Sequence, residues 1–353
     1  MVRNRVVVAM SGGVDSSVAA LILKEQGYDV IGVTLQLTPK EQDFGGCCSI
    51  SNIEDARKVA RILGIKHYVL NMRKIFKEKV IDNFCKEYIN GRTPNPCIRC
   101  NEHIKFGELL RKAKELDAQF VATGHYARIE KENGNYLLKK GIDDKKDQAY
   151  VLYSLPKDKL PYILMPLGYL TKVEVRNLAK KHKLPVASKK DSQEICFVND
   201  KDYPSFVKTV LSYEPKPGPI IDTKGNILGK HKGIIFYTIG QRRRIGVSSK
   251  KPLYVISIDA NKNAIIVGGK EETYFNICIA QDVNFIAIDK LDSVMRVNAK
   301  IRYNSSEVPA LISPLHKSQI EVKFDIPQFA VCCGQSVVFY DKDVVVGGGI
   351  IVK

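Results

Sequence analysis

The first 125 residues alternate between short apolar runs and amphipathic stretches, and this alternation restricts the folds that the chain can adopt. The apolar runs are RVVVAM, YDVIGVTLQL, HYVL and FVAT. Helical periodicity is expected between them, over about residues 16–26, 53–63, 75–88 and 104–116. A β-α rhythm of this kind is typical of a parallel, doubly wound sheet, in which ligands bind at the carboxyl ends of strands. We therefore expect functional groups in the loops 11–17, 94–101 and 124–128.

The pattern changes after the Pro-rich stretch EPKPGPI, which indicates a linker near residues 211–219. Beyond it, the runs VNAKIRY, QIEVKF, QSVVFY and VVVGGGIIV alternate as the strands of a small antiparallel β-barrel do. A chain of 353 residues with 44% apolar content can bury the cores of two or three domains. We predict an α/β catalytic domain over 1–207, a small connecting domain over 208–275 and a C-terminal antiparallel β-barrel over 276–353.

The charge of the chain is strongly positive, with 55 Lys and Arg against 38 Asp and Glu and a formal net charge of +17. Residues 171–251 hold 18 basic and 7 acidic side chains, whereas residues 280–353 hold 8 of each. Arg242, Arg243 and Arg244 form one dense run in the basic region. A solvated face would have the same composition, but we interpret this region as a surface for nucleic acid.

The chain shows no targeting or membrane segment by its sequence. No run of about 18 apolar residues occurs, and the opening MVRNRVVVAMSGG has neither the apolar stretch nor the cleavage site of a secretory signal. We expect a cytoplasmic protein with no membrane partner. Nine cysteines in such a chain are better interpreted as thiols, metal ligands or redox groups than as a disulfide framework.

The stretch SGGVDSS, between the first apolar run and the first helix, predicts an anion site. Glycines let backbone N–H groups approach a phosphate, and the helix N-terminus adds about half a positive charge. The stretch lacks the lysine of the G-x-x-x-x-G-K-[ST] motif and is not a dinucleotide fingerprint. A tight turn capped by Asp15 or Ser16 is the alternative, and Asp15 could also help hold Mg²⁺ against a pyrophosphate.

Two cysteines form a C-x-x-C pair in GRTPNPCIRCNEHIKFGELL, where we expect a loop just before a helix. The helix dipole and the nearby Arg92, Arg99 and Lys105 would lower the thiol pKa values of Cys97 and Cys100. Half of a zinc site is the alternative, but no second pair has suitable spacing, since Cys47 and Cys48, like Cys332 and Cys333, are adjacent. A third candidate thiol, Cys196, lies in DSQEICFVND, whereas Cys85 and Cys278 could equally be buried apolar residues.

These motifs resemble two nested families. SGGVDSS resembles the PP-loop of ATP pyrophosphatases, which cleave ATP between the α and β phosphates. The chain as a whole resembles the tRNA-specific 2-thiouridylases, and the likeness runs nearly from end to end in that family's order. It rests on these blocks: SGGVDSS, GRTPNP with CN after it, ATGHYAR, KDQAYVLY, DSQEICF, HKGIIFYTIGQRRRIG and GQSVVFY with GGGII after it.

The resemblance implies a sulfurtransferase that acts on the wobble uridine in the anticodon arm of tRNA. ATP would adenylate the C2 oxygen with release of pyrophosphate, and a persulfide sulfur would then displace AMP. It implies a PP-loop domain fold, ATP and Mg²⁺ as cofactors, and a sulfur-carrier protein or desulfurase as persulfide donor. The implied ATP-binding residues are Ala9, Met10, Ser11, Gly12, Gly13, Val14, Asp15, Ser16, Leu35 and Gly124. The implied tRNA contacts are Asn95, Pro96, Cys97, His125, Lys146, Asp147, Gln148, Arg302, Tyr303 and Gln335.

The resemblance also assigns the thiols. Cys196 matches the cysteine that receives sulfur as a persulfide, and Cys100 matches the nucleophile that forms a disulfide with it during transfer. The commonest form of the family has Asp where this chain has Cys97. Cys97 could line the pocket, relay sulfur, or join Cys100 and Cys196 in holding an iron–sulfur cluster. We favour the persulfide relay over the cluster.

A purely structural role stays open for several of the residues that the resemblance implies as tRNA contacts. His125 could simply bond the backbone near a strand end, Lys146 and Asp147 could be a surface pair worth less than about 1 kcal/mol, and Arg242 to Arg244 could cap a loop.

Two other functions of the whole protein also remain. One is a PP-loop amide ligase that delivers ammonia and needs no reactive cysteine. The other is an RNA-binding protein with a vestigial nucleotide site.

Overall fold

The computed structural model describes residues 4–37, 50–191, 195–198 and 202–353, and Cys47 and Cys48 lie outside this part. The chain divides into two compact units. The first comprises Met1–Val80, Cys97–Lys201 and Asp343–Val345, and the second comprises Ile81–Pro96, Asp202–Lys342 and Val346–Lys353. No helix within the described residues is both long enough and apolar enough to cross a membrane.

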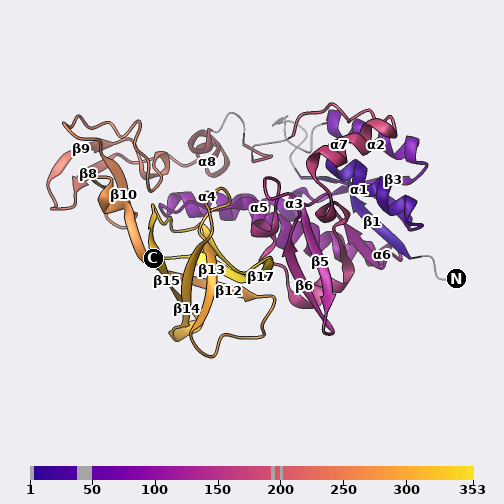
Figure 1. Ribbon diagram of the computed structural model, residues 1–353. Coiled ribbons are helices and arrows are strands. Elements are labelled where there is room, and N and C mark those ends of the chain that lie inside the picture. The colour runs from indigo at the N-terminus through magenta and orange to yellow at the C-terminus, as the bar shows by residue number, and fades with distance from the viewer. Residues whose placement is uncertain (1–3, 38–49, 192–194, 199–201) are drawn as a thin grey trace. The chain divides into compact units, whose positions relative to one another are not determined.

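The first unit is built on a five-stranded parallel sheet with the order β3-β2-β1-β4-β7 (Figure 1). The strands are β1 (Arg5–Ala9), β2 (Asp29–Gln36), β3 (Lys66–Asn71), β4 (Phe120–Ala122) and β7 (Ile163–Leu164). The β1 strand is apolar at Val6, Val7 and Val8, which are all fully buried. The connections leave β1 toward β2 and β3 and return to β4 on its other side. Such a reversal creates a binding crevice at the carboxyl ends of β1 and β4.

The helices of this unit pack around the sheet and against one another. Helix α1 (Val14–Glu25) packs against α2 (Ile50–Leu63) and α7 (Lys172–Lys181), while α6 (Leu109–Glu115) packs against β4. The core around α1 includes Val18, Ala19 and Val59. The predicted alternation of strand and helix is thus confirmed, although β7 was not expected because it is only two residues long.

The predicted loop 94–101 is wrong in its second half. Helix begins at Pro96 as α5 (Pro96–Arg99), continues as the π-helix η2 (Cys100–Glu108) and ends with α6. Proline is favoured at the first helical position because its fixed φ suits a helix and its missing N–H would have no partner there. The sequence NPCIRCN has no apolar periodicity that would indicate where the helix begins. Both cysteines of the C-x-x-C pair lie within the helix.

The first unit also contains smaller elements around the sheet. A hairpin of β5 (Ala127–Glu132) and β6 (Asn135–Lys140) turns at Asn133 and Gly134, which both have positive φ. The remaining helical elements are α3 (Arg73–Phe76), η1 (Lys77–Ile81), η3 (Ala149–Leu152), η4 (Lys157–Tyr162) and η5 (Pro166–Tyr169).

The second unit contains a small four-stranded sheet with the order β10-β11-β8-β9. Its strands are β8 (Gly218–Asp222), β9 (Ile227–His231), β10 (Tyr254–Asp259) and β11 (Ala264–Gly268). Ile220, Val255, Ile265 and Val267 are fully buried in its core. The helices of this unit are α4 (Asp82–Ile89), α8 (Tyr203–Leu211), η6 (Ile234–Phe236), η7 (Glu271–Thr273) and η8 (His316–Ser318).

The second unit ends in a closed antiparallel barrel of six strands, as the alternating pattern predicts. The order is β12-β15-β14-β13-β16-β17, and β12 pairs with β17 to close the barrel. Alternate side chains fill its interior, among them Val297, Ala299, Val322 and Phe339. The strands are β12 (Tyr274–Phe285), β13 (Met295–Lys300), β14 (Val308–Pro314), β15 (Ile320–Phe329), β16 (Ser336–Asp341) and β17 (Val344–Ile351).

Candidate nucleotide and thiol site

The glycine turn after β1 leaves the N-terminus of α1 open to an anion. Gly12 has a φ of +74°, and a Cβ atom there would lie 2.1 Å from the carbonyl oxygen of Asn52. Gly13 is the N-cap residue and no side chain caps the helix. A helix start without a cap has unsatisfied N–H groups, which suit a phosphate. Neither Asp15 nor Ser16 caps the helix, contrary to the alternative interpretation, and anion binding at this turn stays a prediction.

The serines of the loop hold its shape instead of capping it. The Ser17 hydroxyl donates to the Gly13 carbonyl oxygen over 2.8 Å. The Ser16 hydroxyl oxygen accepts from the Ser11 backbone N–H over 3.1 Å. Both serines are buried, so these bonds fix the loop before any ligand arrives.

The end of β4 meets the same loop. Gly124 follows β4 and lies so close to α1 that a Cβ atom would be 2.7 Å from the carbonyl carbon of Asp15 and 2.7 Å from the nitrogen of Ser16. Leu35 and Met10 are buried at the ends of the neighbouring strands. The glycine turn after β1 and Gly124 after β4 thus lie together at the carboxyl ends of these two strands, where the strand order reverses.

Asp15 is held by groups that the sequence did not reveal. The Lys172 ammonium lies 2.7 and 2.8 Å from its two carboxylate oxygens. The hydroxyl of the buried Tyr126 donates to the same carboxylate over 2.7 Å. Burial and the nearby Asp15 charge raise the pKa of Tyr126, so its phenol remains a donor.

Lys172 also bonds Asp191, the first residue of the DSQEICF block, over 2.9 Å. Lys146 and Arg176 contact the same carboxylate at 2.8 and 2.7 Å. Burial alone would raise the pKa of Asp191, but the hydrogen bonds from Lys146 and Lys172 lower it to about 2. Asp191 is therefore ionised at neutral pH and links three cationic side chains.

A second lysine clamps the glycine turn. The Lys189 ammonium donates to the Gly12 carbonyl oxygen over 2.9 Å, to Asn52 over 2.6 Å and to Asp55 over 2.5 Å. An ammonium group has three N–H donors, so these three acceptors satisfy it fully. Sequence reasoning found Lys189 only as part of the basic region and gave no signal for Asn52 or Asp55.

The C-x-x-C pair lies at the start of the continuous helix 96–115. Cys97 is exposed, whereas Cys100 is buried with 9% of its surface accessible. Cys100 begins the nine-residue π-helix η2, and π-helical turns occur frequently at functional sites. The next residue, Asn101, donates from its amide to the Val151 carbonyl oxygen over 2.9 Å, which anchors this end of the helix.

Cys196 belongs to the same unit as the pair and is half-buried. The ring of the adjacent Phe197 packs edge-on against Phe76 of α3, with the centroids 5.6 Å apart. Helix α3 also packs against η2. The segment that carries Cys196 is thus attached to an element that touches the helix of Cys100.

His125 is buried beside the end of β4. Its Nδ1 lies 2.8 Å from the Thr123 hydroxyl and its Nε2 lies 3.4 Å from the Lys105 ammonium. Burial, and secondarily the Lys105 charge, lower the pKa of His125 well below its ordinary value. A neutral ring that accepts from Lys105 would therefore donate through Nδ1 to Thr123.

The implied tRNA contacts in the first unit have partners within the protein. The Asp147 carboxylate accepts from the backbone N–H groups of Gly141 and Ala149, over 3.0 and 3.1 Å. The Gln148 side chain accepts from the Tyr126 backbone over 3.0 Å, and Lys146 is paired with Asp191. These bonds shape the connection from β6 to η3, and a role of these residues toward tRNA stays a prediction.

The second unit contains the other implied contacts. The Gln335 amide donates to the Thr93 carbonyl oxygen over 2.7 Å, and Thr93 lies just ahead of Asn95 and Pro96. The Arg302 guanidinium donates to the Ala330 carbonyl oxygen and to the Cys332 sulfur. Tyr303 is 37% exposed, and the Lys300 ammonium lies 5.9 Å from its ring centroid. Tyr303 therefore offers an accessible ring with a cation beside it.

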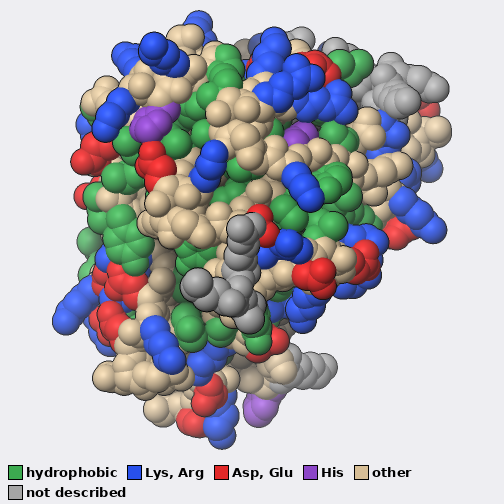
Figure 2. Space-filling view, turned by 90° about the vertical axis from the view of Figure 1, so that its right-hand side faces the viewer, with side chains coloured by type: hydrophobic (Ala, Val, Ile, Leu, Met, Phe, Trp, Pro, Cys, Tyr) green, Lys and Arg blue, Asp and Glu red, His purple; other side chains and the backbone are tan. Residues whose placement is uncertain are grey.

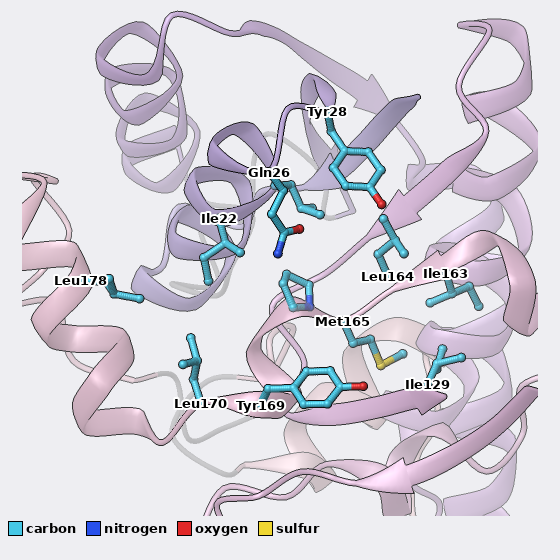
Figure 3. A pocket seen from close by; sticks show the side chains of 12 residues that line it. Ile22, Gln26, Tyr28, Ile129, Ile163, Leu164, Met165, Tyr169, Leu170 and Leu178 are labelled. Carbon is cyan, nitrogen blue, oxygen red and sulfur yellow. The ribbon is translucent and has the colours of Figure 1, made fainter. Parts of the chain in front are cut away.

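A cavity of about 510 Å³ lies at the other end of α1 (Figure 3). Its described lining has no charged side chain, so it is unsuited to a polyphosphate. In Figure 3, Gln26 lies above the space, Tyr28 and Leu164 lie side by side at its upper right, and Tyr169 lies below it. The lining residues are Ile22, Leu23, Gln26, Tyr28, Ile129, Ile163, Leu164, Met165, Pro166, Tyr169, Leu170 and Leu178.

Two further properties concern metal ions and surface charge. Within the described ranges, no three His, Cys, Asp or Glu side chains are grouped so that they could hold a metal ion, and this includes Cys97, Cys100 and Cys196.

Figure 2 shows a face on which Lys and Arg side chains form separate groups with Asp and Glu between them. The charge of that face is mixed rather than uniformly basic.

Comparison with known proteins matches the chain along its length. Its residues 4–200 match the tRNA methyl transferase HUP domain, 204–269 the tRNA methyl transferase PRC-barrel domain and 275–351 the Aminomethyltransferase beta-barrel domain. The tRNA-specific 2-thiouridylase MnmA 1 of Thermoanaerobacter sp. (strain X514) is 58% identical, over 99% of this chain and 98% of the relative. The MnmA proteins of Halothermothrix orenii and Clostridioides difficile are 56% and 53% identical, each over 99% of this chain and over 99% and 98% of the relative, respectively.

Proposed function

We propose that this chain, which belongs to the tRNA-specific 2-thiouridylase family, uses ATP to replace the C2 oxygen of the wobble uridine of tRNA with sulfur. The observation that carries the proposal is the end-to-end identity above 50% with relatives of that name. The arrangement of the first unit supports it, because one compact unit contains an uncapped helix N-terminus and the candidate thiols Cys97, Cys100 and Cys196.

ATP would bind at the glycine turn. The turn and the first residues of α1 offer backbone N–H groups, and Gly124 leaves room where a side chain would collide with Asp15. The Asp15 carboxylate is an oxygen ligand of the kind Mg²⁺ prefers, although it is engaged by Lys172 and Tyr126 in this structure. Bound ATP supplies the electrophilic α-phosphorus.

The reaction needs three displacements, at phosphorus, at carbon and at sulfur. The uridine C2 oxygen attacks the α-phosphorus and pyrophosphate leaves, which turns the oxygen into part of a good leaving group. The terminal sulfur of a Cys196 persulfide then attacks C2, and AMP departs with that oxygen. The Cys100 thiolate attacks the Cys196 sulfur, which breaks the S–S bond to C2-bound sulfur and forms the Cys100–Cys196 disulfide. An external thiol reductant must reopen this disulfide before the next cycle.

The partners follow from this chemistry. The substrate is the anticodon arm of tRNA, and the target base must leave its stack before its C2 can be reached. The sulfur source is a persulfide-delivering sulfur-carrier protein or desulfurase. Arg242, Arg243 and Arg244 are exposed in the second unit and are candidates for phosphate contacts.

The test is an anaerobic incubation with ATP, Mg²⁺, a persulfide donor and unmodified tRNA, followed by nucleoside mass analysis. We expect a uridine whose mass has risen by the exchange of oxygen for sulfur. A methylated nucleoside would instead support the methyl transfer named in two of the matching families. Unchanged uridine without tRNA-dependent pyrophosphate release would support a vestigial nucleotide site.

Cysteine variants complete the test. Cys100→Ser and Cys196→Ser should each abolish thiolation while the protein still binds ATP. The matched control is Cys85→Ser, because Cys85 is fully buried in the second unit and has no role in the proposal. The amide-ligase alternative needs no thiol. Repeated ATP turnover in the Cys100 and Cys196 variants, at the rate of the original chain and without thiolation, would favour it.

A further inference from the structure

The nucleotide loop contains no lysine or arginine, although the polyphosphate that it is proposed to bind is strongly anionic. We propose that Lys172, from the first position of α7, supplies the missing positive charge to the pyrophosphate portion of the nucleotide. The inference rests on the proposed function insofar as it requires ATP binding at this loop. It assigns Lys172 a direct contact with the ligand rather than a purely structural ion pair.

The backbone of Lys172 is fixed by its surroundings. Thr171 and Glu174 form a capping box at the start of α7. The Lys172 backbone N–H donates to the Asp143 carboxylate over 2.9 Å. Only 9% of the residue is exposed, so its ammonium has little freedom to move away from the loop. This placement orients the charge before a ligand binds, which lowers the entropic cost of the contact.

Each present partner of the ammonium would keep at least one other hydrogen bond if the ammonium moved to a phosphate. Its hydrogen-bond partners are the two carboxylate oxygens of Asp15 and one oxygen of Asp191, and it also lies 5.8 Å from the Tyr126 ring centroid. Asp15 would keep the bond from Tyr126, and Asp191 would keep its pairs with Lys146 and Arg176. A phosphate oxygen that replaces an Asp15 oxygen on Lys172 therefore leaves Asp191 paired with two cations, while Asp15 keeps the Tyr126 hydroxyl bond and, with 32% of its side chain exposed, contact with water.

Lys189 is the other lysine in contact with the loop, and its geometry is different. One of its three bonds goes to the Gly12 carbonyl oxygen, which holds the turn itself. The others go to Asn52 and Asp55 in α2. Turning this ammonium toward a phosphate would release the turn from α2. Lys189 therefore has a structural role in holding the glycine turn to α2, whereas the position of Lys172 suits direct contact with the nucleotide.

The experiment compares ligands that differ in their phosphates. Isothermal titration gives the dissociation constants of ATP, pyrophosphate and adenosine for the full chain, for Lys172→Met and for Lys180→Met. Lys180 is the matched control because it is an exposed lysine of the same helix. If the unaltered chain bound no ATP, the proposed function would fail, and this outcome is separate from the result for Lys172.

We expect Lys172→Met to weaken ATP and pyrophosphate by about 10- to 100-fold, the range for loss of one charged hydrogen bond. Adenosine should bind within about twofold of its original affinity, and Lys180→Met should change neither. If Lys172→Met does not fold, the double variant Lys172→Met/Asp191→Asn removes one charge of each sign and is measured instead. Equal losses for ATP and adenosine, or unchanged affinity for both, would overturn the proposal.

Discussion

Gly124 lies against the backbone of Asp15, so that a Cβ atom at Gly124 would come within 2.7 Å of the Asp15 carbonyl carbon. The end of β4 and the first turn of α1 are therefore in direct contact at the reversal of strand order. A glycine is required because the obstacle is backbone rather than the end of a flexible side chain. This contact determines the shape of the proposed nucleotide site.

Gly124→Ala should weaken ATP binding by at least about tenfold, because the added methyl group must push α1 away from β4. Titration with ATP measures the change, and circular dichroism checks that the chain is still folded. The control is Gly269→Ala, where a Cβ would meet only the Glu272 side chain at 3.6 Å. Unaltered ATP affinity in Gly124→Ala would mean that the nucleotide does not use this turn.

Much of the fold was predictable because its signals are local. The buried run Val6 to Val8, the glycine turn and the helix after it are contiguous, so periodicity and motif identify them together. The barrel strands β13 and β14 likewise alternate locally, whereas β16 and β17 are continuous buried runs. The start of the cysteine helix was not predictable from apolar periodicity, because NPCIRCN is polar, although Pro96 at a first helical position is a usable signal.

The ionic part of the site could not be predicted, because its members are far apart in sequence. Lys172 lies 157 residues after Asp15 and stands in KVEVRNLAKK, which has the pattern of an ordinary surface helix. Tyr126 lies within the ATGHYAR block, but nothing in that block indicates that its hydroxyl bonds Asp15. Long-range pairs of this kind depend on topology rather than on local pattern.

Cys97→Ser tests the role of the residue where the resemblance leads us to expect Asp. Cys97 is exposed, unlike Cys100, so its loss should not disturb packing. In the persulfide relay we expect thiolation to remain within about threefold of the original rate, a change of less than about 1 kcal/mol in barrier height. The measurements are single-turnover thiolation and the iron and sulfide content of anaerobically prepared protein. Loss of both iron and activity in Cys97→Ser would favour the cluster.

His125 should make stability depend on pH. Its pKa is lowered in the folded chain by burial, so the unfolded chain takes up a proton first as the pH falls through the ordinary value of 6.5. Between pH 6.5 and 5.5 the folded state should lose about 1 kcal/mol from this group. Urea unfolding at both pH values should therefore show a smaller loss for His125→Asn than for the original chain.

The control for this measurement is His182→Asn, which removes a half-exposed imidazole from the C-terminal end of α7. It removes one imidazole without touching the surroundings of His125, so a change in pH dependence that both variants share is not assigned to His125. An equal pH dependence in the original chain and in His125→Asn would show that His125 becomes protonated without penalty, contrary to its burial.

The arginine run at 242–244 should set part of the salt dependence of tRNA binding. Each phosphate contact that is lost reduces the slope of log affinity against log salt concentration by about 0.7 to 0.9. Replacing Arg242, Arg243 and Arg244 by Gln should therefore reduce the slope by about 2 if all three meet phosphates. Filter binding of unmodified tRNA at several salt concentrations measures this slope.

The charge-matched control replaces Lys131, Lys290 and Lys353, which are exposed outside the basic region, and should leave the slope nearly unchanged. Equal slopes for the two triple variants would place the tRNA contact elsewhere, because loss of net charge alone would then account for any weakening.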